Sequence, residues 1–399
     1  MRSIISVLQH YPSFMAQEAT NRFFKYENLI QFLKKLQDDS RFDIRVAGHS
    51  AEGRSIYLVR YGSGPAKVFF WSQMHGNEAT ATMALLDIFN FLRAEDHSEL
   101  NDLIAKNCTL YFMPMVNPDG AEVFDRRNAQ GIDINRDFHH QQSPEGRLLR
   151  SVRDEISPEF GFNLHDQTTM WSAGSSGNPA TISLLAPAFD TERNINEVRK
   201  NAMQVIIEMN ETLQELIPAH VGRFDDEYEV RAFGDNFQAA GTSTILIEAG
   251  GYADDPEKQH VRRYFFAAML QGLDSITAKT YLDQSTEAYF LIPENKLYHF
   301  QILLRNATLE FNGQKFKSDV GLIVKESINE DLRSVTKTYL IGDMGDLSNR
   351  FGYKDLECST YTLIQTRKFT IDEPADLILM DGLEVLLEVE NGMVTSDKL

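Results

Sequence analysis

The chain has 399 residues, of which 42% are hydrophobic and 24% charged, a composition typical of folded globular proteins. That length is enough for one large domain or two smaller ones. The 39 basic and 58 acidic residues give a formal net charge of −19, which argues against nucleic-acid or anionic-membrane partners held by the overall field of the protein.

Cysteine content and hydropathy give a first expectation for the compartment. The only cysteines are Cys108 and Cys358, so a disulfide framework is excluded. The amino-terminal segment is broken by Gln9, His10 and Pro12 before it reaches the apolar length of a signal peptide. No stretch of about eighteen apolar residues predicts a membrane span. We therefore expect a soluble, cytoplasmic protein with free thiols and no membrane partner.

Apolar runs and helical periodicity alternate through the first part of the chain. Helical spacing predicts helices over residues 25–38, 85–92, 194–217 and 257–278. Apolar runs predict strands over residues 66–73, 109–116, 160–165 and 243–248. A turn sequence, Asn117-Pro118-Asp119-Gly120, follows the second of these strands. Strands separated by helices favour an α/β fold with a mixed, mostly parallel sheet and helices on both faces.

The hydrophobic pattern changes from about residue 286, where helical periodicity is lost. Short β-prone runs such as YHFQILLRN, VGLIVKES and TYTLIQTRKF take its place. Turn dipeptides at Asn312-Gly313, Asp381-Gly382 and Asn391-Gly392 separate such runs. The pattern predicts an α/β domain over residues 1–285 and a β-rich, sandwich-like domain over residues 286–399.

Three predicted strands end in residues that can bind a metal ion or accept a proton. His75 and Glu78 form an H-x-x-E pair just after the first strand, His165 ends the third, and Glu248 ends the fourth. Ligands of open α/β sheets gather beyond the carboxyl ends of strands, so we expect these side chains to meet at one rim. Two imidazoles and one carboxylate, with a position left to water, form the ligand set of a hydrolytic zinc site.

Five ordered segments carry a family resemblance. HGNE, NPDG, RRNAQGIDINRDF, NLHDQ and ILIEAGG resemble the signature segments of the zinc metallocarboxypeptidases (peptidase M14, carboxypeptidase A-like), and the resemblance covers roughly residues 20–280. It implies a zinc carboxypeptidase-like fold for the first domain and one Zn²⁺ per chain. By the same resemblance His75, Glu78 and His165 would bind the metal, and Glu248 would be the general base.

The resemblance also implies roles for the segment before NLHDQ. Asn135 and Arg136 occupy the positions that hold the free carboxylate of the substrate, and a guanidinium suits that task because it forks onto a carboxylate. Asp133 occupies the position that accepts a hydrogen bond from a zinc-bound imidazole. Either Arg126 or Arg127 would stabilise charge on the carbonyl oxygen, and the distance to the DINR segment favours Arg127.

Two further residues are implied downstream. If Phe233-Gly234-Asp235 is the pocket-forming segment, Tyr228 lies where the family carries a mobile tyrosine that closes over the substrate. Asp235 would line the pocket for the terminal side chain and favour a basic or diaminopimelate-like residue. A helix cap is an equally good interpretation of Asp235.

The leading hypothesis is a zinc-dependent carboxypeptidase that hydrolyses a C-terminal peptide bond, in a peptide or a cell-wall peptide. One alternative is a zinc deacylase or amidase on the same fold that acts on N-acyl amino acids, as desuccinylases and aspartoacylases do. Another is a non-catalytic zinc- or peptide-binding protein. The preferred terminal residue, the role of the β domain and the oligomeric state stay open.

Overall fold

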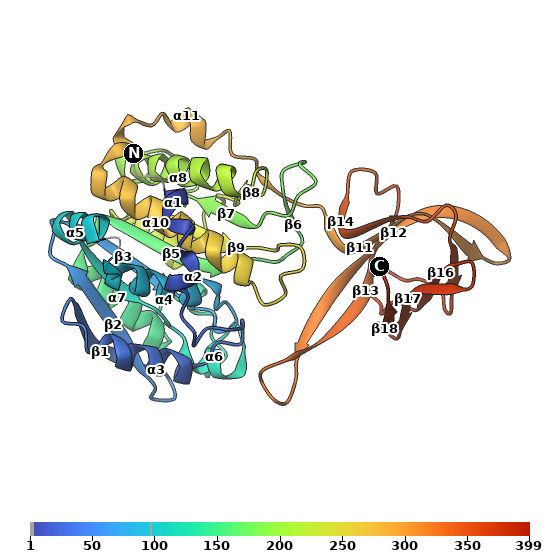
Figure 1. Ribbon diagram of the computed structural model, residues 1–399, viewed down its shortest axis with the longest axis horizontal. Coiled ribbons are helices and arrows are strands. Elements are labelled where there is room, and N and C mark those ends of the chain that lie inside the picture. Colours follow the sequence, from blue (N-terminus) through green and yellow to red (C-terminus); the bar gives the residue numbers. More distant parts are fainter. Residues whose placement is uncertain (1–3, 96–97) are drawn as a thin grey trace. The chain divides into compact units, whose positions relative to one another are not determined.

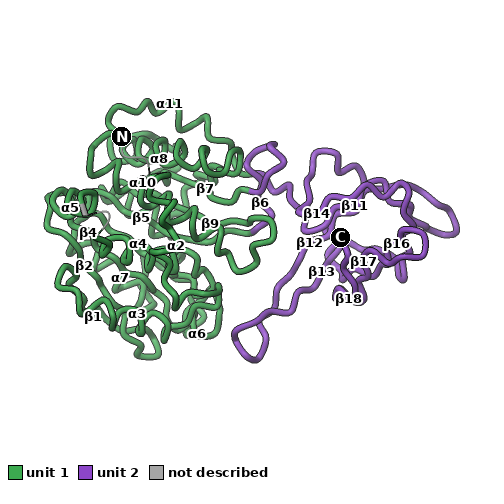
Figure 2. The backbone as a smooth tube through the Cα atoms, in the orientation of Figure 1, with its two compact units in different colours: residues 1–168, 180–295 green, residues 169–179, 296–399 purple. Residues whose placement is uncertain are grey.

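A computed structural model describes residues 4–95 and 98–399 of the chain, which forms two compact units (Figure 2). Unit 1 comprises Met1–Thr168 and Ala180–Asn295, and unit 2 comprises Thr169–Pro179 and Lys296–Leu399. The sequence predicts a single division between residues 285 and 286. In the structure the division follows Asn295, and a short segment from the middle of the chain joins unit 2.

Unit 1 is built on a central sheet, which has eight strands among the described residues, in the order β1-β2-β4-β3-β5-β9-β7-β8 (Figure 1). Four of the seven neighbouring pairs are parallel, including the central run β4-β3-β5-β9. Both faces of this run are covered, so its strands are apolar along their length. The strands are β1 (Phe42–His49), β2 (Ser55–Gly62), β3 (Ala66–Ser72), β4 (Cys108–Met113), β5 (Phe160–Asp166), β7 (Ile182–Leu185), β8 (Val221–Arg223) and β9 (Ser243–Ala249).

Helices pack on both faces of this sheet. Successive apolar side chains of β3 point to opposite faces, so both faces bury hydrophobic surface against helices. Phe70 points into a core shared with α4, α8 and α10, whereas Phe69 and Trp71 pack on the opposite face with α7 and α9. The helices are α1 (Ile4–Leu8), α2 (Tyr11–Phe14), α3 (Tyr26–Leu36), α4 (Thr80–Arg93), α5 (Ser98–Asn107), α6 (Pro118–Val123), α7 (Pro144–Ile156), α8 (Glu197–Leu216), α9 (Phe233–Ala239), α10 (Gln259–Ala278) and α11 (Thr286–Tyr289), with 3₁₀ turns η2 (Ile134–Arg136) and η3 (Thr280–Asp283).

The loop after β3 is shaped by two backbone features. Gln73 has a left-handed conformation (φ 51°), and its side-chain amide donates to the carbonyl of Gly76 at 2.9 Å. A Cβ on Gly76 would lie 2.0 Å from the backbone of Gly120, so only glycine fits where this loop meets α6. Asn117 caps α6 by accepting from the Gly120 N–H at 2.9 Å, so the predicted turn is in fact a helix start. These contacts fix the loop that carries His75 and Glu78.

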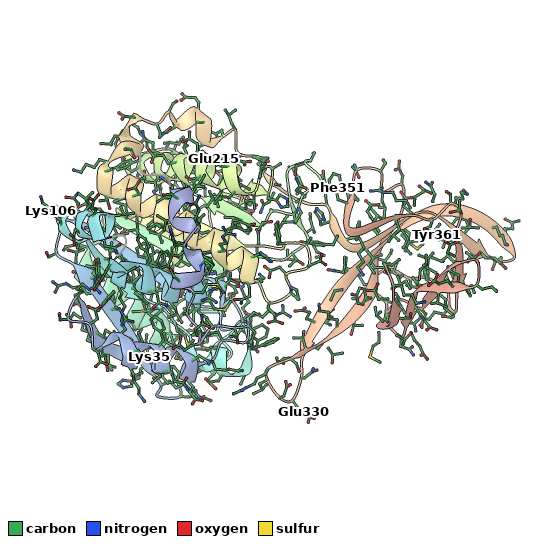
Figure 3. All side chains as sticks on the ribbon, in the orientation of Figure 1. Lys35, Lys106, Glu215, Glu330, Phe351 and Tyr361 are labelled. Atoms are coloured by element: carbon green, nitrogen blue, oxygen red, sulfur yellow. The ribbon has the colours of Figure 1, made fainter. Side chains whose placement is uncertain are left out.

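Unit 2 is formed by β strands, and Figure 3 shows the side chains that they carry. Two four-stranded sheets, β13-β12-β11-β14 and β15-β16-β17-β18, share one core that includes Leu304, Leu322, Leu379 and Leu387. This is the β-rich architecture expected for the C-terminal part of the chain. The strands are β11 (His299–Phe311), β12 (Gln314–Ile328), β13 (Val335–Gly345), β14 (Phe351–Glu357), β15 (Thr362–Gln365), β16 (Leu377–Asp381), β17 (Glu384–Glu390) and β18 (Met393–Asp397), and the short β6 (Trp171–Ala173) pairs with β10 (Asn295–Leu297).

A search for membrane-spanning helices covered the described parts of both units. None of the helices there combines the length and the hydropathy that a bilayer span requires.

Candidate active site

The metal-binding candidates meet at the carboxyl ends of β3 and β5. His75 and Glu78 lie in the loop between β3 and α4, and a turn in which the Glu78 N–H donates to the His75 carbonyl at 3.1 Å brings their side chains together. His165 lies on β5, next to β3 in the sheet. The potential ligand atoms of the three residues lie within 4.8 Å of one another, and all three side chains are buried. The structure thus brings together the three residues proposed from the sequence.

The Glu78 carboxylate is the centre of this group. His75 Nδ1 lies 2.8 Å from Oε1, and His165 Nδ1 lies 2.8 Å from Oε2. Burial acts to raise the pKa of Glu78, but the charges and hydrogen bonds of the two imidazoles outweigh it and hold that pKa well below its usual range. Burial lowers the pKa of His165, which favours the neutral imidazole that a metal requires.

The donor atoms fit a zinc ion. Two Nδ1 atoms and a carboxylate converge on one buried point, which is the two-histidine, one-carboxylate set of hydrolytic zinc sites. Each Nδ1 atom faces the carboxylate rather than the protein around it. A divalent cation among these groups would compensate the buried negative charge of Glu78.

Asp133 lies on the far side of the His75 ring. Its Oδ1 lies 3.1 Å from His75 Nε2 and also accepts from the Asn135 N–H at 3.0 Å, which fixes the carboxylate at the start of η2. A proton on Nε2 donated to Asp133 leaves the Nδ1 lone pair free to bind a metal. Burial lowers the pKa of His75, yet the Glu78 charge and the Asp133 hydrogen bond raise it overall.

The arginine at this centre is Arg126, and the sequence-based preference for Arg127 is corrected. Arg126 Nη1 donates to Glu78 Oε1 at 3.1 Å, and its Nε donates to Asp133 Oδ2 at 3.0 Å. Arg127 is exposed and its Nη1 donates to the Gly131 carbonyl at 3.0 Å. The chain enters this loop from α6 through Phe124, a left-handed C-cap, which sets the direction of the residues that follow.

Glu248 lies beside His165 in the sheet. The two residues are register partners in the parallel β5–β9 pair, and Glu248 Oε2 is buried with no hydrogen-bond partner among the described residues. Burial raises the pKa of Glu248 well above its usual range, and the negative charges of Glu78 and Asp166 add to that effect. A carboxylate in this environment accepts a proton readily.

Lys258 is a residue of this centre that the sequence analysis missed. Its buried ammonium donates to Asp166 Oδ2 at 2.8 Å and to the Ala249 carbonyl at 3.0 Å. Asp166 follows His165 on β5, and Ala249 follows Glu248 on β9, so Lys258 ties together the two strand ends that carry the site. The sequence offered one signal, the acid directly after His165 in FNLHDQ, but nothing that identified its partner.

The predicted substrate-binding residues come from two segments that contact each other. Asn135 Oδ1 accepts from the Phe233 N–H at 2.9 Å, and Arg136 Nε lies 3.1 Å from a Glu229 carboxylate oxygen. Asp235 Oδ1 accepts from the Glu229 N–H at 3.0 Å, so Asp235 stabilises this loop. Burial raises the pKa of Asp235 to about 7. Burial and the nearby Asp235 charge raise the pKa of Tyr228, which lies half-buried in the same loop.

Known proteins resemble the part of the chain that carries this site. Residues 29–203 match the family model described as zinc carboxypeptidase. The catalytic chain of carboxypeptidase N from Homo sapiens is 29% identical over 164 residues, which is 35% of this chain and 36% of that protein. Carboxypeptidase SOL1 from Arabidopsis thaliana is 29% identical over 104 residues, or 24% of this chain and 21% of that protein. The aligned segments span about a third of the length of the carboxypeptidase N chains.

Solved structures share the fold. A metallo-carboxypeptidase from Burkholderia cenocepacia gives a TM-score of 0.52 at 17% identity, covering 66% of this chain and 70% of its own. A metallo-carboxypeptidase from Pseudomonas aeruginosa, in complex with (2-guanidinoethylmercapto)succinic acid, gives 0.50 at 16% identity, covering 65% and 71%.

Proposed function

We propose that this protein is a zinc-dependent metallocarboxypeptidase that hydrolyses the C-terminal bond of a peptide or cell-wall peptide, since residues 29–203 match the zinc carboxypeptidase family model. The observation that carries the proposal is the convergence of His75, Glu78 and His165 beside Glu248, whose Oε2 has no hydrogen-bond partner in the part of the chain that the structure describes. Three metal ligands and a free proton acceptor are what metal-assisted hydrolysis requires.

One Zn²⁺ would be held by His75 Nδ1, His165 Nδ1 and the Glu78 carboxylate. The ion supplies Lewis-acid polarisation of the scissile carbonyl and acidifies the attacking water. Asp133 would keep the His75 ring in the tautomer that leaves Nδ1 free, because it accepts from Nε2. Lys258 would hold the strand ends that carry His165 and Glu248.

Glu248 would take the proton of the water at Oε2 and deliver it to the leaving amine. Its buried Oε2, which has no hydrogen-bond partner among the described residues, is available for both transfers. Arg126 would stabilise the negative charge that develops on the carbonyl oxygen. Its side chain is 42% exposed, so it is accessible to substrate while it pairs with Glu78 and Asp133.

Asn135 and Arg136 would bind the terminal carboxylate of the substrate, because their segment continues directly from Asp133 at the metal centre. Tyr228 would close over the bound residue, and Asp235 would contribute to the pocket for the terminal side chain. The raised pKa of Asp235, about 7, means that this pocket would gain negative charge as the pH rises through neutrality.

Side-by-side assays of hippuryl peptides and N-acyl amino acids, with zinc supplied, test this proposal. We expect release of the terminal amino acid from the free-acid peptides and loss of that activity in Glu248→Gln. Cleavage confined to N-acyl amino acids would contradict the peptidase proposal and indicate a deacylase on the same fold. Stoichiometric zinc without turnover of a broad peptide library would indicate a binding protein.

A further inference from the structure

An internal carboxylate occupies one edge of the arginine proposed to bind substrate. Glu229 Oε2 lies 3.1 Å from Nε of Arg136. The same carboxylate accepts from Arg231, through Nε at 3.0 Å and Nη2 at 2.8 Å. Glu229 therefore bridges two guanidiniums, only one of which belongs to the proposed carboxylate-binding pair.

Glu229 is held firmly from its own loop. Its N–H donates to Asp235 Oδ1 at 3.0 Å, its carbonyl accepts from the Ala232 N–H at 2.9 Å, and its Oε1 also accepts from the Arg231 N–H at 3.1 Å. Bonds from Arg231 lower the pKa of Glu229 to about 2, so the carboxylate stays ionised at neutral pH. Moving Glu229 out of the way would break several of these bonds at once.

The loop is also tied to the segment that carries Arg136. The Phe138 N–H donates to the Arg231 carbonyl at 3.3 Å, and the Phe233 N–H donates to Asn135 Oδ1 at 2.9 Å. Contacts on both sides of Arg136 thus fix where Glu229 sits relative to it. The side chains of Glu229 and Arg136 are 29% and 38% exposed, so substrate can reach this ion pair.

Within the described residues, the Arg136 guanidinium makes one ion pair and one hydrogen bond, which leaves N–H groups of Nη1 and Nη2 available. Nε forms an ion pair with Glu229 Oε2 at 3.1 Å, and Nη1 donates to the Asn135 carbonyl at 2.8 Å. The remaining N–H groups of Nη1 and Nη2 lie side by side, which is the geometry of a two-bond fork onto a carboxylate. A flexible arginine would have to give up rotamer freedom to present that fork, whereas one restrained by the ion pair with Glu229 loses less.

We propose that Glu229 is a positioning residue that orients the Arg136 guanidinium for the terminal carboxylate of the substrate. This inference rests on the proposed function only in naming that carboxylate as the ligand. Glu229 does not act as a competitor for Arg136, because Arg231 and the loop backbone hold it at the Nε edge rather than across the available N–H groups of Nη1 and Nη2.

Steady-state kinetics of Glu229→Gln on a free-acid hippuryl peptide form the first test. We expect KM to rise roughly five- to tenfold with kcat changed less than twofold, because an ion pair between part-exposed groups is lost and the chemistry is untouched. Glu227→Gln, a change to an exposed acid of the same loop, is the matched control and should match the wild type. A lowered KM in Glu229→Gln would show that Glu229 competes with substrate, and would overturn the inference.

A double-mutant cycle separates positioning from general damage to the loop. With Arg136→Ala as the background, Glu229→Gln should have no further effect on KM, since its action passes through Arg136. Equal effects in both backgrounds would overturn the inference. Arg231→Gln, which removes the anchor of Glu229 but not its charge, should raise KM by a smaller factor and gives a second readout if Glu229→Gln folds poorly.

Binding measurements keep this inference distinct from the proposed activity. Calorimetry of the zinc-loaded protein with a hippuryl peptide as free acid and as amide requires no turnover. A free-acid preference that shrinks in Glu229→Gln supports the inference even if the protein hydrolyses neither peptide, in which case only the proposed activity fails. Equal binding of acid and amide by the wild type would overturn it.

Discussion

Replacing Glu248 by glutamine removes the proposed proton acceptor while keeping the shape of the side chain. The Glu248 side chain is 8% exposed, and its Oε2 atom makes no hydrogen bond within the described residues. Replacing this oxygen therefore breaks no hydrogen bond within the described residues. We therefore expect Glu248→Gln to fold, to bind zinc and to be nearly inactive.

The expected loss of kcat depends on whether another carboxylate near the site could act as the general base. A positioned general base contributes roughly two to four decades to kcat, or about 3–5 kcal/mol of barrier. The nearest candidate substitute is Asp166, but its Oδ2 accepts from Lys258 at 2.8 Å and from the Thr80 hydroxyl at 2.6 Å. Asp166 Oδ1 is buried without a hydrogen-bond partner among the described residues, but the ion pair with Lys258 stabilises the charged carboxylate and makes it a poorer base. We therefore expect the upper half of the range, roughly three to four decades.

The same substitution should stabilise the metal-free fold. An acid whose folded pKa is raised binds its proton more tightly when folded, so its contribution becomes unfavourable as the pH rises above the unfolded value. Thermal unfolding of chelator-treated protein should show a higher Tm for Glu248→Gln than for the wild type at pH 8, with a smaller difference at pH 5.

Peptide hydrolysis and zinc content, measured on the same preparations, are the assay. Glu208→Gln, which neutralises a buried carboxylate on α8 that accepts from the Thr280 hydroxyl, controls for loss of a buried charge and should keep its kcat. A Glu248→Gln protein with full zinc and a kcat within tenfold of the wild type would refute the reasoning that makes Glu248 the proton acceptor.

Three further outcomes are expected. Arg126→Gln should lower kcat roughly a hundredfold while zinc stays bound, which is the usual effect of losing one oxyanion donor. Arg127→Gln should keep kcat within twofold of the wild type. Equal losses of peptide hydrolysis in the two variants would contradict Arg126 as the oxyanion residue. Lys258→Met should lower the free energy of unfolding by about 3–5 kcal/mol, the usual cost of leaving one member of a buried ion pair unpaired. Urea denaturation measures this change. A loss below about 1 kcal/mol would contradict the role of Lys258 in joining β5 and β9. Zinc affinity should fall as the pH falls through the raised pKa of His75, because a protonated imidazole cannot bind metal; chelator competition from pH 8 to pH 5.5 measures it, and a flat profile would contradict His75 as a ligand.

The position of the proposed metal ligands was predictable from the sequence because each follows or ends a strongly apolar strand. Runs such as those before His75 and His165 fix a strand and its end within a residue or two, and parallel pairing then brings the ends to one rim. The short strands β7 and β8 and the hairpin β1–β2 lacked such runs and were not predicted. β7 and β8 are buried but have only four and three residues, too few for an apolar run to identify a strand. β1 and β2 mix buried and exposed positions, so they carry no continuous apolar run.

What the sequence could not supply depends on local backbone direction and on long-range contacts. Arg126 and Arg127 are chemically equal neighbours, and only the backbone conformation after α6 decides which one faces Glu78. Lys258 is separated from Asp166 by 92 positions, so no local spacing connects them. Segment 169–179 joins unit 2 through contacts with residues far along the chain, such as the Tyr353 hydroxyl donating to the Thr169 carbonyl.

Zinc-edge anomalous diffraction from crystals of the zinc-loaded protein tests the central claim most directly. We expect one strong anomalous peak per chain, bound by His75 Nδ1, His165 Nδ1 and the Glu78 carboxylate at about 2.0–2.2 Å, with Glu248 beside it and unbound. A peak elsewhere in the chain, or a metal that leaves either imidazole uncoordinated, would contradict the account.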